Sequence, residues 1–201
     1  RLGYDPFPKE ASLAIAAYVK ALATPGVVPT PRVHQNLGQL YEGEKQYTDA
    51  LRSYKDAMQT DSTFAPAYKS AGKLYNLATR YPDAARFYLK YTQLKPDDAE
   101  GQIGLAEAFF KMGTSRKAQE AAERAYAIDS TDTRVRLLLA RTTFLTNDLA
   151  RSERFFASVL FGSGVLFFTY LTPGDPMFTR STSSYWRVRA PSRSMIAGPN
   201  I

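Results

Sequence analysis

The residues that could support catalysis or metal binding are few in this sequence. It has no cysteine and a single histidine, His34. Without thiolates there is no disulfide, no Cys nucleophile and no sulfur-ligated zinc site. No other metal ligands cluster near His34 in the sequence. With a single histidine, the sequence gives little support to a Ser-His-Asp mechanism. We therefore expect His34 to be a packing residue; a Ser-Lys pair or a carboxylate pair stays open, but no pairing stands out.

Two short motifs in the C-terminal part bear on binding chemistry. Gly-Ser-Gly at 162–164 lacks the third glycine and the following Lys-Ser or Lys-Thr of a phosphate loop. Tyr185, Trp186, Arg187 and Arg189 interleave rings with guanidinium groups, which can stack on single-stranded bases. Without a wider basic groove, the same cluster is better interpreted as a contact arm for a protein. We expect no catalytic residue, no metal and no cofactor, so the chain is not predicted to be an enzyme.

Composition indicates a folded chain rather than a disordered one. Its 201 residues are 44% hydrophobic and 13% aromatic, which is enough to bury a sizeable core. The net charge is +7, but 26 Lys and Arg are interspersed with 19 Asp and Glu, so charge alone does not predict nucleic-acid binding. The chain begins at Arg1 rather than Met, so a targeting segment cannot be read from its N-terminus. Cytoplasmic and periplasmic locations both stay open, with or without membrane association.

A regular repeat organises most of the sequence. Aligning the chain on itself with a shift of 34 places small residues at two recurring positions. The first set is Gly38, Gly72, Ala106 and Ala140, and the second is Ala50, Ala84, Ala118 and Ser152. A period of this length is diagnostic of a solenoid built from helix pairs. Small residues then mark the places where two helix backbones approach closely, and rings fill the space beside them.

The repeat resembles the tetratricopeptide family, whose pattern runs aromatic, Leu-Gly, Tyr, Ala, aromatic and Pro. The first unit reads His34, Leu37-Gly38, Tyr41, Ala50, Tyr54 and Ala57, and the second reads Tyr68, Ala71-Gly72, Tyr75, Ala84, Tyr88, Tyr91 and Pro96. The third lacks rings at Gln102 and Ala122, and the fourth has Thr143 where a ring is expected. This resemblance implies an all-α, right-handed α-solenoid of helix-turn-helix repeats.

Boundary signals divide the chain into segments. We predict four repeats at 31–64, 65–98, 99–132 and 133–161, which together contain eight helices. A further helix over 9–24 makes 1–30 an N-terminal cap and linker, and 162–201 is predicted to be irregular. The expected N-caps are Asp61-Ser62, Asp97-Asp98 and Asp129-Ser130, and turns are expected near Gly43, Tyr81-Pro82, Gly113 and Asn147-Asp148.

The resemblance also implies where a partner would bind, because the first helix of each repeat lines a concave groove. The predicted groove residues are Gln35, Gln39, Lys69, Lys73, Asn76, Glu107, Phe110, Arg134 and Arg141, with Glu42, Glu100, Ile103 and Leu137 beside them. Their mixed charge suits a partner segment of alternating charge. The alternative is that they are ordinary solvated helix faces.

Some family members hold a carboxyl terminus in a two-carboxylate clamp of Lys, Asn, Asn, Lys and Arg. Lys69 matches the first Lys of that clamp, and Arg134 could replace the later one. However, Lys73 and Gly104 stand where asparagines belong, and Leu138 stands where Arg belongs. Binding of chaperone tails is therefore disfavoured.

The segment 155–171 differs from the repeats because it carries no charge over 17 residues. Its first part, 155–161, is expected to complete the last helix, and 165–171 to cover the end of the solenoid. A membrane-inserting segment is the alternative, since the run is near the lower length limit for a spanning helix. Overall we expect a protein-interaction scaffold, a subunit or assembly factor of a larger complex. The alternatives are a membrane-associated subunit anchored by 155–171 and a nucleic-acid-binding repeat protein.

Overall fold

Helices account for the regular structure of the residues that the structure describes. The computed structural model describes residues 8–26 and 28–161, and within them it contains helices and no strand. The helices are α1 (Pro8–Ala23), α2 (Pro31–Gly43), α3 (Tyr47–Thr60), α4 (Ala65–Leu77), α5 (Tyr81–Leu94), α6 (Ala99–Lys111), α7 (Ser115–Ile128), α8 (Thr133–Leu145) and α9 (Leu149–Phe161). The eight helices predicted for 31–161 are α2 to α9. The tail 162–201 lies outside the described residues.

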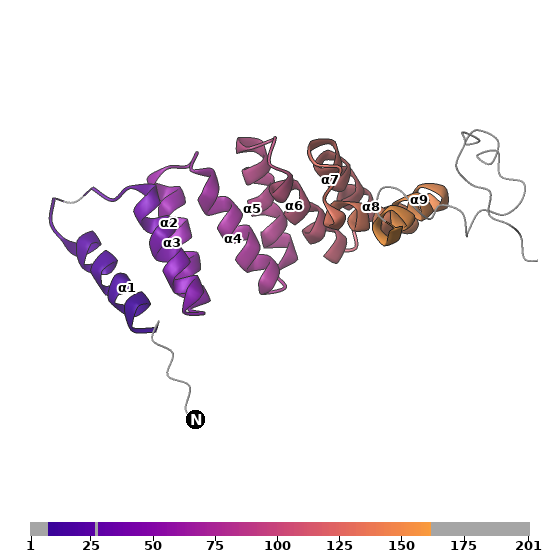
Figure 1. Cartoon of the computed structure of the whole chain (residues 1–201). Helices are drawn as coiled ribbons and strands as arrows, with labels where there is room; N and C mark the ends of the chain where they lie inside the picture. Colours follow the sequence, from indigo (N-terminus) through magenta and orange to yellow (C-terminus); the bar gives the residue numbers. More distant parts are fainter. Residues whose placement is uncertain (1–7, 27, 162–201) are drawn as a thin grey trace, which may run out of the picture. The chain divides into compact units, whose positions relative to one another are not determined.

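The helices pack in chain order, each against the next (Figure 1). The most extensive contacts join α2 with α3, α4 with α5, α6 with α7 and α8 with α9, so these are the helix pairs. The second helix of each pair then packs on the first helix of the next, as α3 does on α4. The first helices begin at Pro31, Ala65, Ala99 and Thr133, in steps of 34 residues. The sequence period is therefore the period of the structure.

Contacts between tyrosine rings and glycines allow neighbouring helices to pack closely. The Tyr54 ring covers Gly38 so tightly that a methyl group on the glycine would overlap it. Tyr88 touches Gly72 of its own pair and Gly104 of the following pair, and it is 6% exposed. Because a folded interior has little room to relax, these contacts require the small residues of the repeat at those places.

In the weaker fourth repeat, polar side chains stand where the pattern has rings. Arg136 occupies the first ring position and donates to the carbonyl oxygens of Thr131 and Ser158. Ser158 belongs to the last turn of α9, whose carbonyls have no partner within the helix. Thr143 is fully buried and donates to the Leu139 carbonyl one turn earlier. Arg136 therefore links α8 to the last turn of α9, whereas Thr143 satisfies its buried hydroxyl within α8.

The turn inside each pair contains one residue in the left-handed region. These residues are Lys45 (φ 59°), Thr79 (φ 58°), Gly113 (φ 74°) and Asn147 (φ 64°), again spaced by 34. The turns predicted at Gly113 and Asn147 are confirmed. The turns expected near Gly43 and Tyr81-Pro82 lie directly beside these residues, at 44–46 and 78–80. Gly43 itself is the last residue of α2, and Tyr81-Pro82 opens α5, because proline is well tolerated in a first helical turn.

The helix caps partly differ from the prediction. Asp98 caps α6 by accepting from the Glu100 N–H, as expected. Asp61 and Asp129 instead accept from the N–H and hydroxyl of Thr63 and Thr131, two residues on, which closes a turn before the helix. The cap of α8 is Asp132, and α4 begins after Phe64 without a side-chain cap.

The N-terminal and C-terminal helices, α1 and α9, were both predicted from the sequence. The helix expected over 9–24 is α1, which packs on α2 and receives a hydrogen bond from Asn36 Nδ2 on the Tyr18 hydroxyl, at 3.3 Å. Residues 155–161 complete α9, as predicted. Within residues 8–26 and 28–161, no helix has the length and apolar character needed to cross a membrane. The remainder of 155–171 lies outside the described residues.

The left-handed residues give a reciprocal test of stability. Thr79 is exposed and β-branched, so the left-handed conformation strains it, whereas asparagine tolerates that region. We expect Thr79→Asn to raise the free energy of unfolding by about 1 kcal/mol, and Asn147→Thr to lower it by a similar amount. Urea titrations followed by circular dichroism would measure both. Equal and unchanged midpoints would contradict the assignment of strain.

Asp98 gives a second test, because it joins α4, α5 and α6. Its Oδ2 accepts from Lys69 Nζ at 2.8 Å and from the Tyr91 hydroxyl, while Oδ1 caps α6. We expect Asp98→Ala to cost about 2 kcal/mol of unfolding free energy near neutral pH. The exposed neighbour Asp97 is the matched control, and Asp97→Ala should cost about 0.5 kcal/mol or less.

The cost of Asp98→Ala should also depend on pH. Burial raises the pKa of Asp98, but the hydrogen bonds from Lys69 and Tyr91 outweigh it and hold the pKa below its ordinary value. A carboxylate with a depressed pKa stabilises the fold above its unfolded pKa of about 3.9, and that contribution is lost as the pH falls through the folded value. The difference between wild type and Asp98→Ala should therefore shrink below about pH 4. A pH-independent difference would contradict this role.

Candidate functional site

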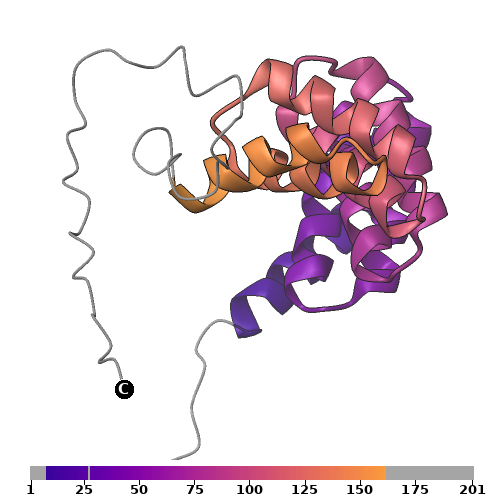
Figure 2. The ribbon, with the colours of Figure 1, turned by 90° about the vertical axis from the view of Figure 1, so that its right-hand side faces the viewer.

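The first helices of the pairs form the inner side of the stack. Besides packing within pairs, α4 contacts α6 and α6 contacts α8, whereas α3, α5, α7 and α9 make no comparable contacts with one another. Elements lie closer together on the inside of a curved stack than on its outside. Figure 2 views these helices from the α9 end. We call the solvent-facing side of α2, α4, α6 and α8 the inner face.

Two of the residues predicted to be exposed on this face are buried. Gln35 is only 5% exposed, because its Nε2 donates to Ser70 Oγ at 2.9 Å across to the second pair. Ile103 is 2% exposed and belongs to the core. Both predictions of exposure were wrong, since the packing surface of the first helix is wider than the motif positions indicate. Gln39, Lys73, Glu107, Arg134 and Arg141 are exposed, and Lys69, Asn76 and Phe110 are half-buried.

Most charged groups predicted for the groove are already paired across the repeats. The pairs are Lys73 with Glu42 at 3.0 Å, Lys69 with Asp98 at 2.8 Å, and Arg134 with Glu100 at 2.7 Å. Glu42 also accepts from the Tyr54 hydroxyl, and Arg134 also pairs with Asp132 at 2.8 Å. A partner of alternating charge would have to break these pairs. Their main effect is to tie neighbouring repeats together, each by about 0.2–1 kcal/mol.

A pocket of about 340 Å³ opens on the inner face between α4, α6 and α8. Its lining residues are Asn76, Tyr81, Glu107, Phe110, Lys111, Arg134, Leu137, Leu138 and Arg141. Five of these were predicted as groove residues, so the structure brings Asn76, Glu107, Phe110, Arg134 and Arg141 together. Gln39, Lys69 and Lys73 do not line this pocket. Its volume is at the lower end of the range for ligand sites, about 300–1,000 Å³, which suits one or two side chains.

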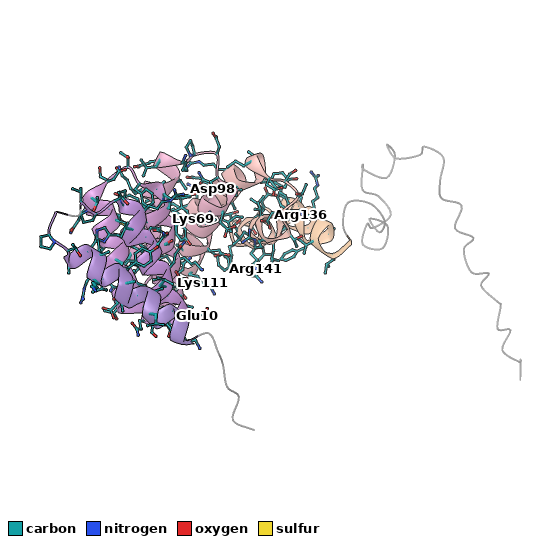
Figure 3. The ribbon with its side chains drawn as sticks, turned by 60° about the vertical axis from the view of Figure 1, so that its left-hand side comes forward. Glu10, Lys69, Asp98, Lys111, Arg136 and Arg141 are labelled. Atoms are coloured by element: carbon teal, nitrogen blue, oxygen red, sulfur yellow. The ribbon has the colours of Figure 1, made fainter. Side chains whose placement is uncertain are left out.

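The electrostatics of the pocket are set by three groups. Lys111 and Arg141, both labelled in Figure 3, make no ion pair or hydrogen bond through their side chains with other described residues. Glu107 also has no ion pair within the described part of the chain. Partial desolvation raises the pKa of Glu107; the nearby Arg134 and Lys111 oppose that rise and Glu100 adds to it. The pocket therefore presents two open cations, one carboxyl group and an apolar wall.

Sequence reasoning missed three of the lining residues. Lys111 lies one turn after Glu107, on the same face of α6, and that spacing could have identified it. Tyr81 comes from α5, the second helix of a pair, and no signal in the first helices points to it. Leu138 was considered only as a mismatch to the clamp. The predicted contact arm, Tyr185, Trp186, Arg187 and Arg189, lies outside the described residues.

Comparisons with known protein sequences give a limited match. No protein-family profile matches the chain. A stretch of 99 residues is 28% identical to the human protein O-mannosyl-transferase TMTC2, and it covers 48% of this chain. The chain spans only 12% of that relative's length, so the match concerns a small part of it.

Solved structures match far more of the chain. A MamA crystal structure superposes with a TM-score of 0.69 over 76% of this chain and 88% of its own, at 24% identity. A tetratricopeptide repeat protein from Parabacteroides merdae gives 0.68 over 76% and 60%, at 17% identity. YrrB, described as a TPR protein with an unusual peptide-binding site, gives 0.65 over 72% and 74%, at 22% identity. With these neighbours and its own helix pairs, the chain has the tetratricopeptide-repeat fold, an all-α solenoid.

Proposed function

We propose that this protein is an interaction scaffold that binds a segment of a partner protein on its inner face. The observation that carries the proposal is the pocket between α4, α6 and α8, which combines an apolar wall with charges that the fold itself leaves unpaired. Charged groups that stabilise the solenoid are paired, whereas Lys111 and Arg141 are available to a ligand. A structural neighbour, YrrB, is described as having a peptide-binding site, which agrees with this use of the fold.

A role as a subunit or assembly factor of a larger complex follows from the same proposal. One solenoid shape serves many unrelated partners, so the fold alone does not identify the complex. The C-terminal arm around Tyr185 to Arg189 remains a proposed second contact. We propose no catalytic step, because the described pocket offers a carboxyl group and cations but no nucleophile paired with a base.

Site-specific photo-crosslinking tests the binding face directly. A photoreactive amino acid would be introduced at Gln39 or Phe110 on the inner face, and separately at Lys90 or Arg124, which are exposed on the second helices α5 and α7. After irradiation in native cell lysate, we expect protein adducts from the inner positions and few from the outer ones. The measurement is the mass and identity of each adduct.

The positions on α5 and α7 are matched controls, because their side chains are exposed but do not lie on the inner face. Unchanged circular dichroism spectra and melting temperatures would confirm that all four variants fold. Adducts of the same proteins and the same yield from both faces, or none from the inner face, would contradict the proposal.

A further inference from the structure

We propose that the pocket between α4, α6 and α8 recognises an acidic side chain next to a bulky apolar one in an extended peptide. The inference rests on the proposed function, since it names the chemistry of the partner segment that the inner face would bind. The carboxylate of the peptide pairs with Lys111 and Arg141, and the apolar side chain packs on Phe110, Leu137 and Leu138.

The two cations are the first part of the argument. Other inner-face cations, such as Lys69, Lys73 and Arg134, are held by carboxylates of the same chain at 2.7 to 3.0 Å. Lys111 and Arg141 line the pocket without such a partner among the described residues. A carboxylate that enters the pocket would gain charge-assisted hydrogen bonds without breaking any pair. Neither residue occupies a position of the two-carboxylate clamp, so this is a different anion site.

The wall of the pocket is the second part. Phe110 and Leu137 are half-buried and present apolar surface to the pocket, whereas Leu138 is 6% exposed and belongs to the core. Covering such surface is favourable by about 25 cal/mol for each Å² removed from water. The volume of about 340 Å³ has room for one or two side chains rather than for a helix. A short extended segment therefore fits it better than a folded surface does.

Glu107 restricts the anion that the pocket accepts. It lies among the lining residues with Lys111 and Arg141, and its pKa is raised by desolvation. Repulsion grows with the charge of the ligand, so a phosphate group with nearly two negative charges would be disfavoured more than a carboxylate. The pocket is therefore assigned to aspartate or glutamate.

Selection from a peptide library tests this assignment. The immobilised full chain would be challenged with phage-displayed random heptapeptides, and the bound pool would be sequenced. We expect enrichment of Asp or Glu beside Leu, Ile, Phe or Met. The most enriched peptide would then be synthesised, and its affinity would be measured by fluorescence anisotropy. Lys111→Glu and Arg141→Glu should each weaken binding about tenfold or more.

Controls make the outcomes distinct. Lys90→Glu and Arg124→Glu make the same change of charge on the outer helices and should leave the affinity within about twofold. If the selected peptides lack acidic residues, or if their binding survives Lys111→Glu and Arg141→Glu, the pocket assignment is wrong while inner-face binding stands. If a labelled single-stranded oligouridine binds and loses affinity in Arg141→Glu, the pocket serves nucleic acid instead. If no peptide is enriched, both the assignment and the proposed function fail.

Discussion

Contacts of tyrosine rings with glycines determine how closely the helices pack within the first two pairs and how closely the second pair approaches the third. Tyr88 is the clearest case, because it fills the space against Gly72 within one pair and against Gly104 of the next. A larger residue at either glycine, or a smaller one in place of the ring, would change the distance between repeats. That distance in turn decides which side chains of α4, α6 and α8 can meet on the inner face.

The ion pairs of the inner face follow from this spacing. Arg134 reaches Glu100 at 2.7 Å although the two residues are 34 apart in sequence and occupy equivalent positions in neighbouring repeats. Lys73 reaches Glu42 in the preceding repeat, and Lys69 reaches Asp98, which caps the first helix of the following pair. Because of these ion pairs, most charged side chains on the inner face already have a partner within the chain. Lys111 and Arg141 differ because neither makes an ion pair with a carboxylate among the described residues, although Glu107 lies near Lys111, and for that reason we assign them to a ligand.

Much of the fold could be predicted from the sequence, because the period of 34 fixes where each helix begins. Side-chain partners could not be predicted in the same way, since they depend on the rotation of each helix. Gln35 was expected at the surface, but it reaches Ser70 and is buried. The pocket was half predicted: Glu107 and Arg141 were identified from their helix, whereas Tyr81 joins from a second helix that the repeat pattern assigns to packing. The turn residues Lys45 and Thr79 were missed because neither is a residue type that favours the left-handed region.

A double-mutant cycle on Gly104 and Tyr88 tests the central claim most directly. Its measured quantity is the free energy of unfolding, obtained from urea titrations of the wild type, Gly104→Ala, Tyr88→Leu and the double variant. In the wild-type background the added methyl group should overlap the ring and cost about 1–3 kcal/mol. Without the ring, the same change should be neutral or stabilise by up to about 1 kcal/mol, because alanine favours the helix. An equal cost of Gly104→Ala in both backgrounds would contradict the claim that the ring sets the spacing of the repeats.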